Sequence, residues 1–185
     1  NTIAFNLGLN YNFNDKQEFI VDSLPSKDTY KERIKYNIAF RTGISEGPVP
    51  HLGQRQFYHI GLYADKRIGR KSALQLGTDV FFSRYLQDYI EFVSVAFPES
   101  HHSYADPDTD YKRIGLFVGH ELFINKLSIE AQVGYYVYKP LDYEIDLYQR
   151  IGIKYYLYKN IFTGVGLKTH GGRAEAIEAT IGVRL

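Results

Sequence analysis

The chain has 185 residues, and its 22 Lys plus Arg nearly balance 21 Asp plus Glu, so the net charge of +1 gives no general argument for nucleic-acid binding. Cysteine is absent, which excludes disulfides and thiolate chemistry. No run of 18 apolar residues predicts a transmembrane helix, whereas 17 Tyr, 12 Phe and 16 Gly favour an all-β protein.

Apolar and polar residues alternate along most of the chain, which is the pattern of a strand with one apolar face. In the segment Leu127–Tyr138, for example, Ile129 and Val133 share a face, and Glu130 lies on the opposite one. We predict nine such strands, in chain order Thr2–Phe13, Ile34–Ile44, Phe57–Ile68, Ser72–Tyr85, Tyr111–Phe123, Leu127–Tyr138, Tyr148–Leu157, Ile161–His170 and Glu175–Leu185.

The links between these strands alternate in length. Short turns near 69–71, 124–126 and 158–160 alternate with longer links at 45–56, 86–110 and 139–147, although the last link, 171–174, is short. Short turns at one end and long loops at the other are typical of an antiparallel outer-membrane β-barrel. We therefore predict one transmembrane barrel domain over residues 1–185, with a polar connector at 14–33. Because single-chain bacterial barrels usually have an even strand number, we expect either a miscount or a further strand before Asn1.

A soluble barrel or sandwich would show the same alternation, with the apolar face turned toward the core. The nearly uninterrupted apolar faces favour the membrane instead, because hydrocarbon can cover them. On the polar faces, Gly is combined with charged residues that suit a wet, charge-paired lumen: Asp79, Glu121, Glu130, Arg150, Lys154 and Arg184. The residues that match an aromatic girdle near the strand ends are Tyr11, Tyr36, Tyr58, Tyr135 and Tyr155.

Three segments, Tyr63–Ser83, Asp108–Glu144 and Tyr148–Leu185, resemble the Bacteroidota outer-membrane acyloxyacyl hydrolases, relatives of the PagL family of lipid A deacylases. The resemblance implies hydrolysis of an ester-linked acyl chain on lipid A by a Ser nucleophile, a His base and an orienting acid. In the family, a His-x-Ser motif precedes a strand similar to Asn1–Phe13. By this resemblance the two catalytic residues lie before Asn1, and the chain is the carboxy-terminal part of a longer barrel.

Within the chain, the candidate catalytic residues are His170 and Glu175, the only local pair of a His and an acid beside a tight turn. Position 172 is Gly, so the His-x-Ser motif is not completed there. The alternative interpretation is a polar hairpin end near the membrane surface.

Two further patterns are weaker. Asp106, Asp108 and Asp110 have the opening spacing of an EF-hand, but the turn Gly and the closing Glu are missing, so we predict no metal and no cofactor. A basic cluster around a short turn either meets anionic headgroups or is simply a solvated hairpin tip; it consists of Lys66, Arg67, Arg70 and Lys71.

Three functions remain open. The first is a lipid A acyl-ester hydrolase of which this chain is the non-catalytic portion. The second is a non-catalytic barrel subunit of an outer-membrane protein complex, in barrel assembly or secretion. The third is a small pore or adhesive barrel. In each case we expect the bacterial outer membrane as location, its lipids and lipopolysaccharide as partners together with other outer-membrane proteins, and no nucleic acid.

Overall fold

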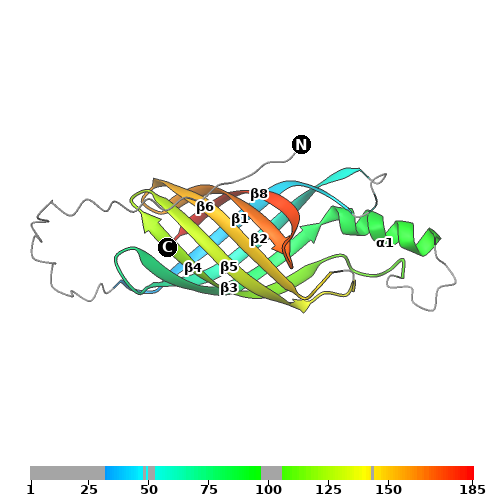
Figure 1. Ribbon diagram of the computed structural model, residues 1–185, viewed down its shortest axis with the longest axis horizontal. Coiled ribbons are helices and arrows are strands. Elements are labelled where there is room, and N and C mark those ends of the chain that lie inside the picture. Colours follow the sequence, from blue (N-terminus) through cyan, green and yellow to red (C-terminus); the bar gives the residue numbers. More distant parts are fainter. Residues whose placement is uncertain (1–31, 48, 50–52, 97–105, 143) are drawn as a thin grey trace, which may run out of the picture.

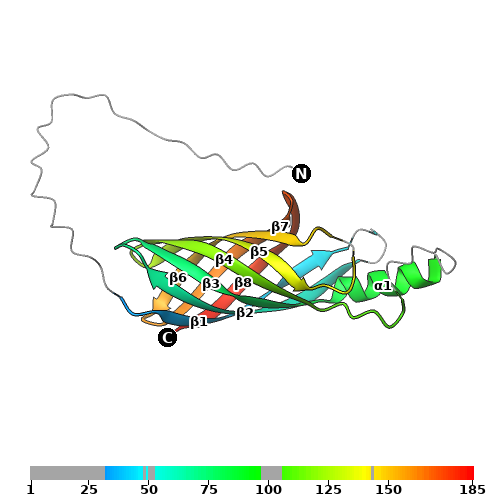
Figure 2. The same cartoon turned by 90° about the horizontal axis from the view of Figure 1, so that it is seen from below.

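The structure is a computed structural model, and it describes residues 32–47, 49, 53–96, 106–142 and 144–185. Eight antiparallel strands form a closed barrel in which each strand pairs with its neighbour in sequence and β1 pairs with β8 (Figures 1 and 2). The strands are β1 (Lys35–Glu46), β2 (Gln54–Arg67), β3 (Ser72–Ser83), β4 (Arg113–Ile124), β5 (Leu127–Tyr138), β6 (Leu147–Tyr158), β7 (Ile161–His170) and β8 (Arg173–Arg184). One helix, α1 (Arg84–Ala96), directly follows β3.

Eight of the nine predicted strands are found, and the predicted ninth, Thr2–Phe13, lies outside the described residues, as does most of the connector 14–33. The expectation that this sheet is part of a larger barrel is wrong, because the eight described strands close on themselves. Ile38 pairs with Val183 and Phe40 with Ile181, so the first and last described strands close on each other. Alternation along a strand reveals its faces but not which strand edge it pairs with, and that is why the closure of β1 on β8 was not predicted.

Helix α1 was predicted as part of a long link, and the strand before it was predicted to continue to Tyr85. The strand ends at Ser83 instead. From there the apolar residues follow helical spacing, and Tyr85, Leu86, Ile90 and Val93 are buried on one face of the helix. No helix among the described residues is long and apolar enough to cross a membrane.

The barrel has an apolar exterior and a polar interior. On the outer face, Leu76 is 65% exposed and Val118 is 60% exposed, whereas Arg41 and Asp79 inside are fully buried. This arrangement is the inverse of a soluble barrel and is the one that a hydrocarbon solvent requires. Tyr36, Tyr135 and Tyr155 are exposed on the outer face as predicted for a girdle, Tyr58 is half-buried there, and Tyr11 is outside the described residues.

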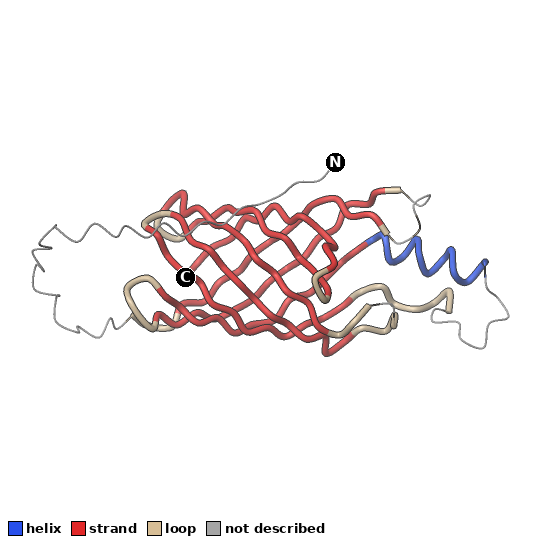
Figure 3. The backbone as a smooth tube through the Cα atoms, in the orientation of Figure 1, coloured by secondary structure: helices blue, strands red, loops and turns tan. Residues whose placement is uncertain are grey.

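The two ends of the barrel differ, as Figure 3 shows. The short turns between β2 and β3, β4 and β5, and β6 and β7 lie at one end, together with Leu185; we call this the turn end. Helix α1, the longer loops and the β7–β8 hairpin lie at the opposite end, the loop end. In bacterial outer-membrane barrels the short turns are periplasmic and the long loops face outward.

The lumen is filled by side chains. Ion pairs of the predicted charge network connect Lys154 to Glu121 (3.1 Å) and Glu130 (2.6 Å), and Arg150 to Asp79 (2.8 Å). Aromatic rings fill the remaining space: Tyr63, Phe81, Phe117, Tyr136, Tyr148 and Phe162. Glycine on the lumenal face makes room for them, since a Cβ on Gly134 would lie 2.1 Å from the Tyr148 ring. An eight-stranded barrel is just wide enough to be filled in this way, so the described lumen is a packed core.

The apolar exterior predicts a depth-dependent cost for charge. Val118→Lys, near the middle of β4, should destabilise the folded barrel in bilayers by about 2–4 kcal/mol. The matched change Ile124→Lys at the turn end of the same strand should cost no more than about 1 kcal/mol. Urea titration of each variant in vesicles measures both values, and equal costs would contradict the membrane orientation.

The lumenal network makes a second prediction. Asp79→Ala leaves the buried cations Arg41 and Arg150 with one shared acid, Glu178, in place of two, and should cost about 3–5 kcal/mol of unfolding free energy. Asp88→Asn, which breaks the exposed ion pair with Arg55, should cost less than about 1 kcal/mol. The same urea titration compares them, and similar losses would show that the lumenal pairs are not the main electrostatic support.

Candidate functional site

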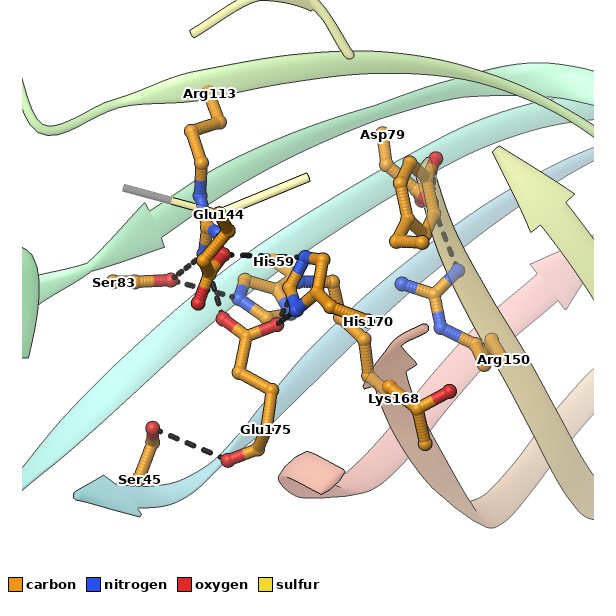
Figure 4. Close-up of polar contacts among 12 residues, drawn as sticks. Ser45, His59, Asp79, Ser83, Arg113, Glu144, Arg150, Lys168, His170 and Glu175 are labelled. Atoms are coloured by element: carbon orange, nitrogen blue, oxygen red, sulfur yellow. Dashed lines mark hydrogen bonds and ion pairs between the residues drawn. The ribbon is translucent and has the colours of Figure 1, made fainter. Parts of the chain in front are cut away.

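The candidate residues His170 and Glu175 do meet across the β7–β8 hairpin at the loop end (Figure 4). Their closest atoms, His170 Nδ1 and Glu175 Oε2, are 3.4 Å apart. The hairpin can be this tight because Gly171 and Gly172 both have positive φ angles, 55° and 84°, which glycine adopts without strain. Sequence reasoning therefore placed the pair correctly.

A third acid joins this pair from a different part of the chain. Glu144, in the β5–β6 loop, places Oε2 3.2 Å from His170 Nε2, and the Tyr136 hydroxyl lies 2.9 Å from the same nitrogen. The hydroxyl of Tyr85, at the start of α1, lies 3.2 Å from Glu144 Oε1 and 3.0 Å from Glu175 Oε1, and its single proton can be donated to either carboxylate. The loop and the helix thus meet over the barrel opening through one polar cluster.

Two cations balance the two carboxylates. Arg113, at the start of β4, donates to Glu144 (2.5 Å) and to Glu175 (2.7 Å), and Lys168 pairs with Glu175. Burial, followed by the negative charge of Glu175, raises the pKa of Glu144 above its ordinary 4.5, although Arg113 opposes that shift. Burial also raises the pKa of the Tyr85 hydroxyl well above 10. Tyr85 therefore remains a hydrogen-bond donor.

A cavity of about 320 Å³ opens above this cluster, and Glu46, Tyr85, Glu144, His170 and Glu175 are among its lining residues. The ligand atoms of Glu144, His170 and Glu175 lie within 4.8 Å of one another, which is compact enough for a metal ion. Arg113 and Lys168 already occupy the carboxylates, however, so a cation would have to displace an ion pair. The donor set fits a hydrogen-bonded polar mouth better than a metal centre.

A second His–acid arrangement lies deeper, and sequence reasoning missed it as a unit. His59 Nδ1 is 2.7 Å from Glu178 Oε1, and His59 Nε2 is 3.3 Å from Ser83 Oγ. If Nδ1 carries the proton and donates it to Glu178, Nε2 is free to accept from Ser83, as a Ser–His–acid triad requires. Arg113 Nη2 donates to Ser83 Oγ at 2.9 Å and thereby connects the triad to the mouth cluster.

This triad is sealed inside the barrel. Ser83 is 1% exposed, and both His59 and Glu178 are 0% exposed. The rings of Phe57 and Phe81 pack against His59, with centroids 4.4 and 4.7 Å away. No substrate reaches Ser83 in this conformation. Because the three residues come from β2, β3 and β8, no local sequence motif contains them. The only signal in the sequence is that all three lie on the predicted polar faces of their strands.

The weaker predicted patterns lie elsewhere. Asp106, Asp108 and Asp110 belong to the loop end, Asp110 pairs with Lys112 (3.7 Å), and residues 101–105 are outside the described part. Glu144, His170 and Glu175 form the only candidate metal cluster among the residues that the structure describes. The basic cluster lies at the turn end, far from the mouth, with Lys66, Arg70 and Lys71 exposed.

The family model for the acyloxyacyl hydrolase C-terminal domain (PagL_C) matches residues 34–185, which is the whole described barrel. The chain belongs to this family. Among solved structures, the acyloxyacyl hydrolase C-terminal domain is similar to the neisserial surface protein A (NspA), with a TM-score of 0.43 and 13% identity over 83% of this chain and 99% of that one. No curated protein matches the chain.

The raised pKa of Glu144 gives a pH dependence. Between pH 4.5 and the higher pKa in the folded protein, the folded state binds more protons at Glu144 than the unfolded state does. The wild type should therefore lose stability as pH rises through this window, relative to Glu144→Gln, which has no proton to lose. Urea titrations of both proteins across pH 4.5–7 test this, and parallel pH profiles would contradict it.

Proposed function

We propose that this barrel is the membrane-embedded, non-catalytic domain of an outer-membrane protein that hydrolyses acyl esters of lipid A. The family of acyloxyacyl hydrolase C-terminal domains supports the reaction class, and the apolar exterior supports the location. The observation that carries the non-catalytic role is the complete burial of Ser83, His59 and Glu178, the triad found within the described barrel.

The mouth pair supports the same conclusion. His170 contacts Glu144, Glu175 and the Tyr136 hydroxyl, but no serine or threonine hydroxyl of the described residues lies within hydrogen-bond distance of its ring. An ester hydrolase needs a nucleophile beside its base. His170 and Glu175 therefore serve to hold the β5–β6 loop and the β7–β8 hairpin together, and the catalytic Ser and His remain predicted upstream of Asn1.

The packed lumen argues against a pore. Ion pairs and aromatic rings cross it at several levels, and the largest fully buried side chains include Arg41, Tyr148 and Lys154. The barrel is then an anchor that fixes the hydrolytic part of the protein at the membrane surface.

Mass spectrometry of lipid A from cells with and without the gene tests the hydrolase. Lipid A from the deletion strain should keep one ester-linked acyl chain that lipid A from the wild type has lost, whereas unchanged acylation overturns the proposal in favour of a partner subunit. A protein that stays in solution without detergent overturns the membrane location.

Two variants of the full-length gene product test where the chemistry takes place. Ser83→Ala and His170→Ala should each retain at least half of the lipid A deacylation, since neither residue attacks the ester or activates its nucleophile. A loss of more than about 100-fold, comparable to the removal of a general base, would place catalysis in this barrel. Heat-modifiable migration on gels serves as the control for a folded barrel.

A further inference from the structure

Charge is distributed unevenly between the two ends of the barrel. The turn end is basic: its turns and strand ends carry Lys66, Arg70, Lys71, Lys126 and Lys159, all exposed. The acids Glu32 and Asp65 are engaged there by Arg67 and Arg184. At the loop end, Lys139 pairs with Asp142 and Asp146 and Arg113 pairs with Glu144, and the exposed carboxylates of Glu91, Asp106 and Asp108 add further negative charge. A phosphate group is therefore attracted to the turn end.

A long groove rises from this basic end along the outer wall. It has a volume of about 860 Å³ and is lined mostly by apolar atoms from β2 to β7. Its lower edge is a row of paired outward residues, Lys66, Leu74, His120, Ala131, Ile151 and Leu167. The upper edge is formed by the next outward residue toward the loop end on each of the same strands, for example Ala64, Leu76 and Val118. We call it the wall groove.

The dimensions of the wall groove suit a fatty acyl chain. The row crosses five strand spacings, or about 24 Å at roughly 4.8 Å each. Because barrel strands are tilted, a row across them climbs obliquely from the turn end toward the loop end. The small side chains of Ala64 and Ala131 lower the two edges, and most of the lining is apolar; Gln149 and Thr169, at the far end of the upper edge, hydrogen-bond to each other.

One residue in the groove is anomalous. His120 is exposed on the outer face of β4, and among the described strands it is the only His, Lys, Arg, Asp or Glu on that face away from the strand ends. His120 is paired with Leu74 on one neighbouring strand and with Ala131 on the other. Its ring has no hydrogen-bond partner among the described residues. An imidazole facing lipid is costly unless it finds a partner, and an ester carbonyl can supply one.

We propose that the wall groove binds one acyl chain of an anionic glycerophospholipid. The phosphate of this lipid contacts Lys66, Arg70 and Lys71, and the ester carbonyl accepts a hydrogen bond from His120. His120 lies two strands along the row from Lys66, a distance of about 10 Å. This rests on the membrane location in the proposed function. The basic end selects a phospholipid of the periplasmic leaflet rather than a lipid entering from the acidic loop end.

Native mass spectrometry of the full-length protein, released from nanodiscs with equal phosphatidylglycerol and phosphatidylcholine, tests this directly. The wild type should retain one phosphatidylglycerol in preference to phosphatidylcholine. Ala131→Phe, which fills the groove, should lower this retention at least fivefold, whereas Ala179→Phe, on the outer face of β8 and outside the groove, should change it less than twofold. Equal retention of the two lipids, or equal losses from the two Phe variants, would overturn the proposal.

The headgroup and the imidazole are tested separately. The triple variant K66Q/R70Q/K71Q should lose the preference for phosphatidylglycerol, and the matched variant K126Q/K159Q should keep it. His120→Leu should lower retention about threefold, and His120→Asn, which restores a donor, should recover it. A dimer mass that disappears with Ala131→Phe would assign the groove to a second copy instead. A wild type that fails to enter nanodiscs overturns the proposed membrane location itself, while normal insertion without bound lipid overturns only the groove.

Discussion

The structure depends on the neutralisation of charge inside a closed, narrow barrel. Asp79 pairs with both Arg41 and Arg150, and Glu178 pairs with Arg150 and contacts His59, all at 0–2% exposure. In a membrane protein the outer face must be apolar, so the polar side chains of every strand can only point inward. They are tolerated there because each charge meets its opposite at hydrogen-bond distance. Removing one member would leave the others without a partner, and the pairs connect strands that are not adjacent in the sheet, such as β3 and β6.

The same requirement explains why the barrel contains a triad that has no access to substrate. A lumen built from Ser, His, Glu and Arg on facing strands produces Ser–His–acid contacts as a by-product of giving its buried polar side chains partners. Ser83 accepts from Arg113 while it contacts His59, and His59 contacts Glu178. Geometry resembling a hydrolase therefore does not identify one, and burial decides between a network that supports the fold and a site that acts on substrate.

The loop end and the outer wall carry the features that distinguish this barrel. At the loop end, Arg113 joins the β5–β6 loop to the β7–β8 hairpin through Glu144 and Glu175. On the wall, His120 places an imidazole among mostly apolar residues in the groove that leads to the basic turn end. The Arg113 cluster is a set of polar contacts at the barrel mouth, whereas His120 is a single polar side chain on the outer wall. The two lie on opposite faces of the same sheet.

The sequence by itself determined the strands, their two faces, the charged lumen and the meeting of His170 with Glu175, because these follow from alternation and from a tight hairpin. It could not determine the closure of β1 on β8, since a strand's pattern does not record its neighbour. Helix α1 was not predicted because it continues directly from a strand. The helical spacing of its apolar residues extends over only a few turns. Only the tertiary structure brought Glu144 and Arg113 to the mouth, and Ser83 to His59 and Glu178. Contacts between residues 24 to 119 positions apart depend on the register of a whole barrel.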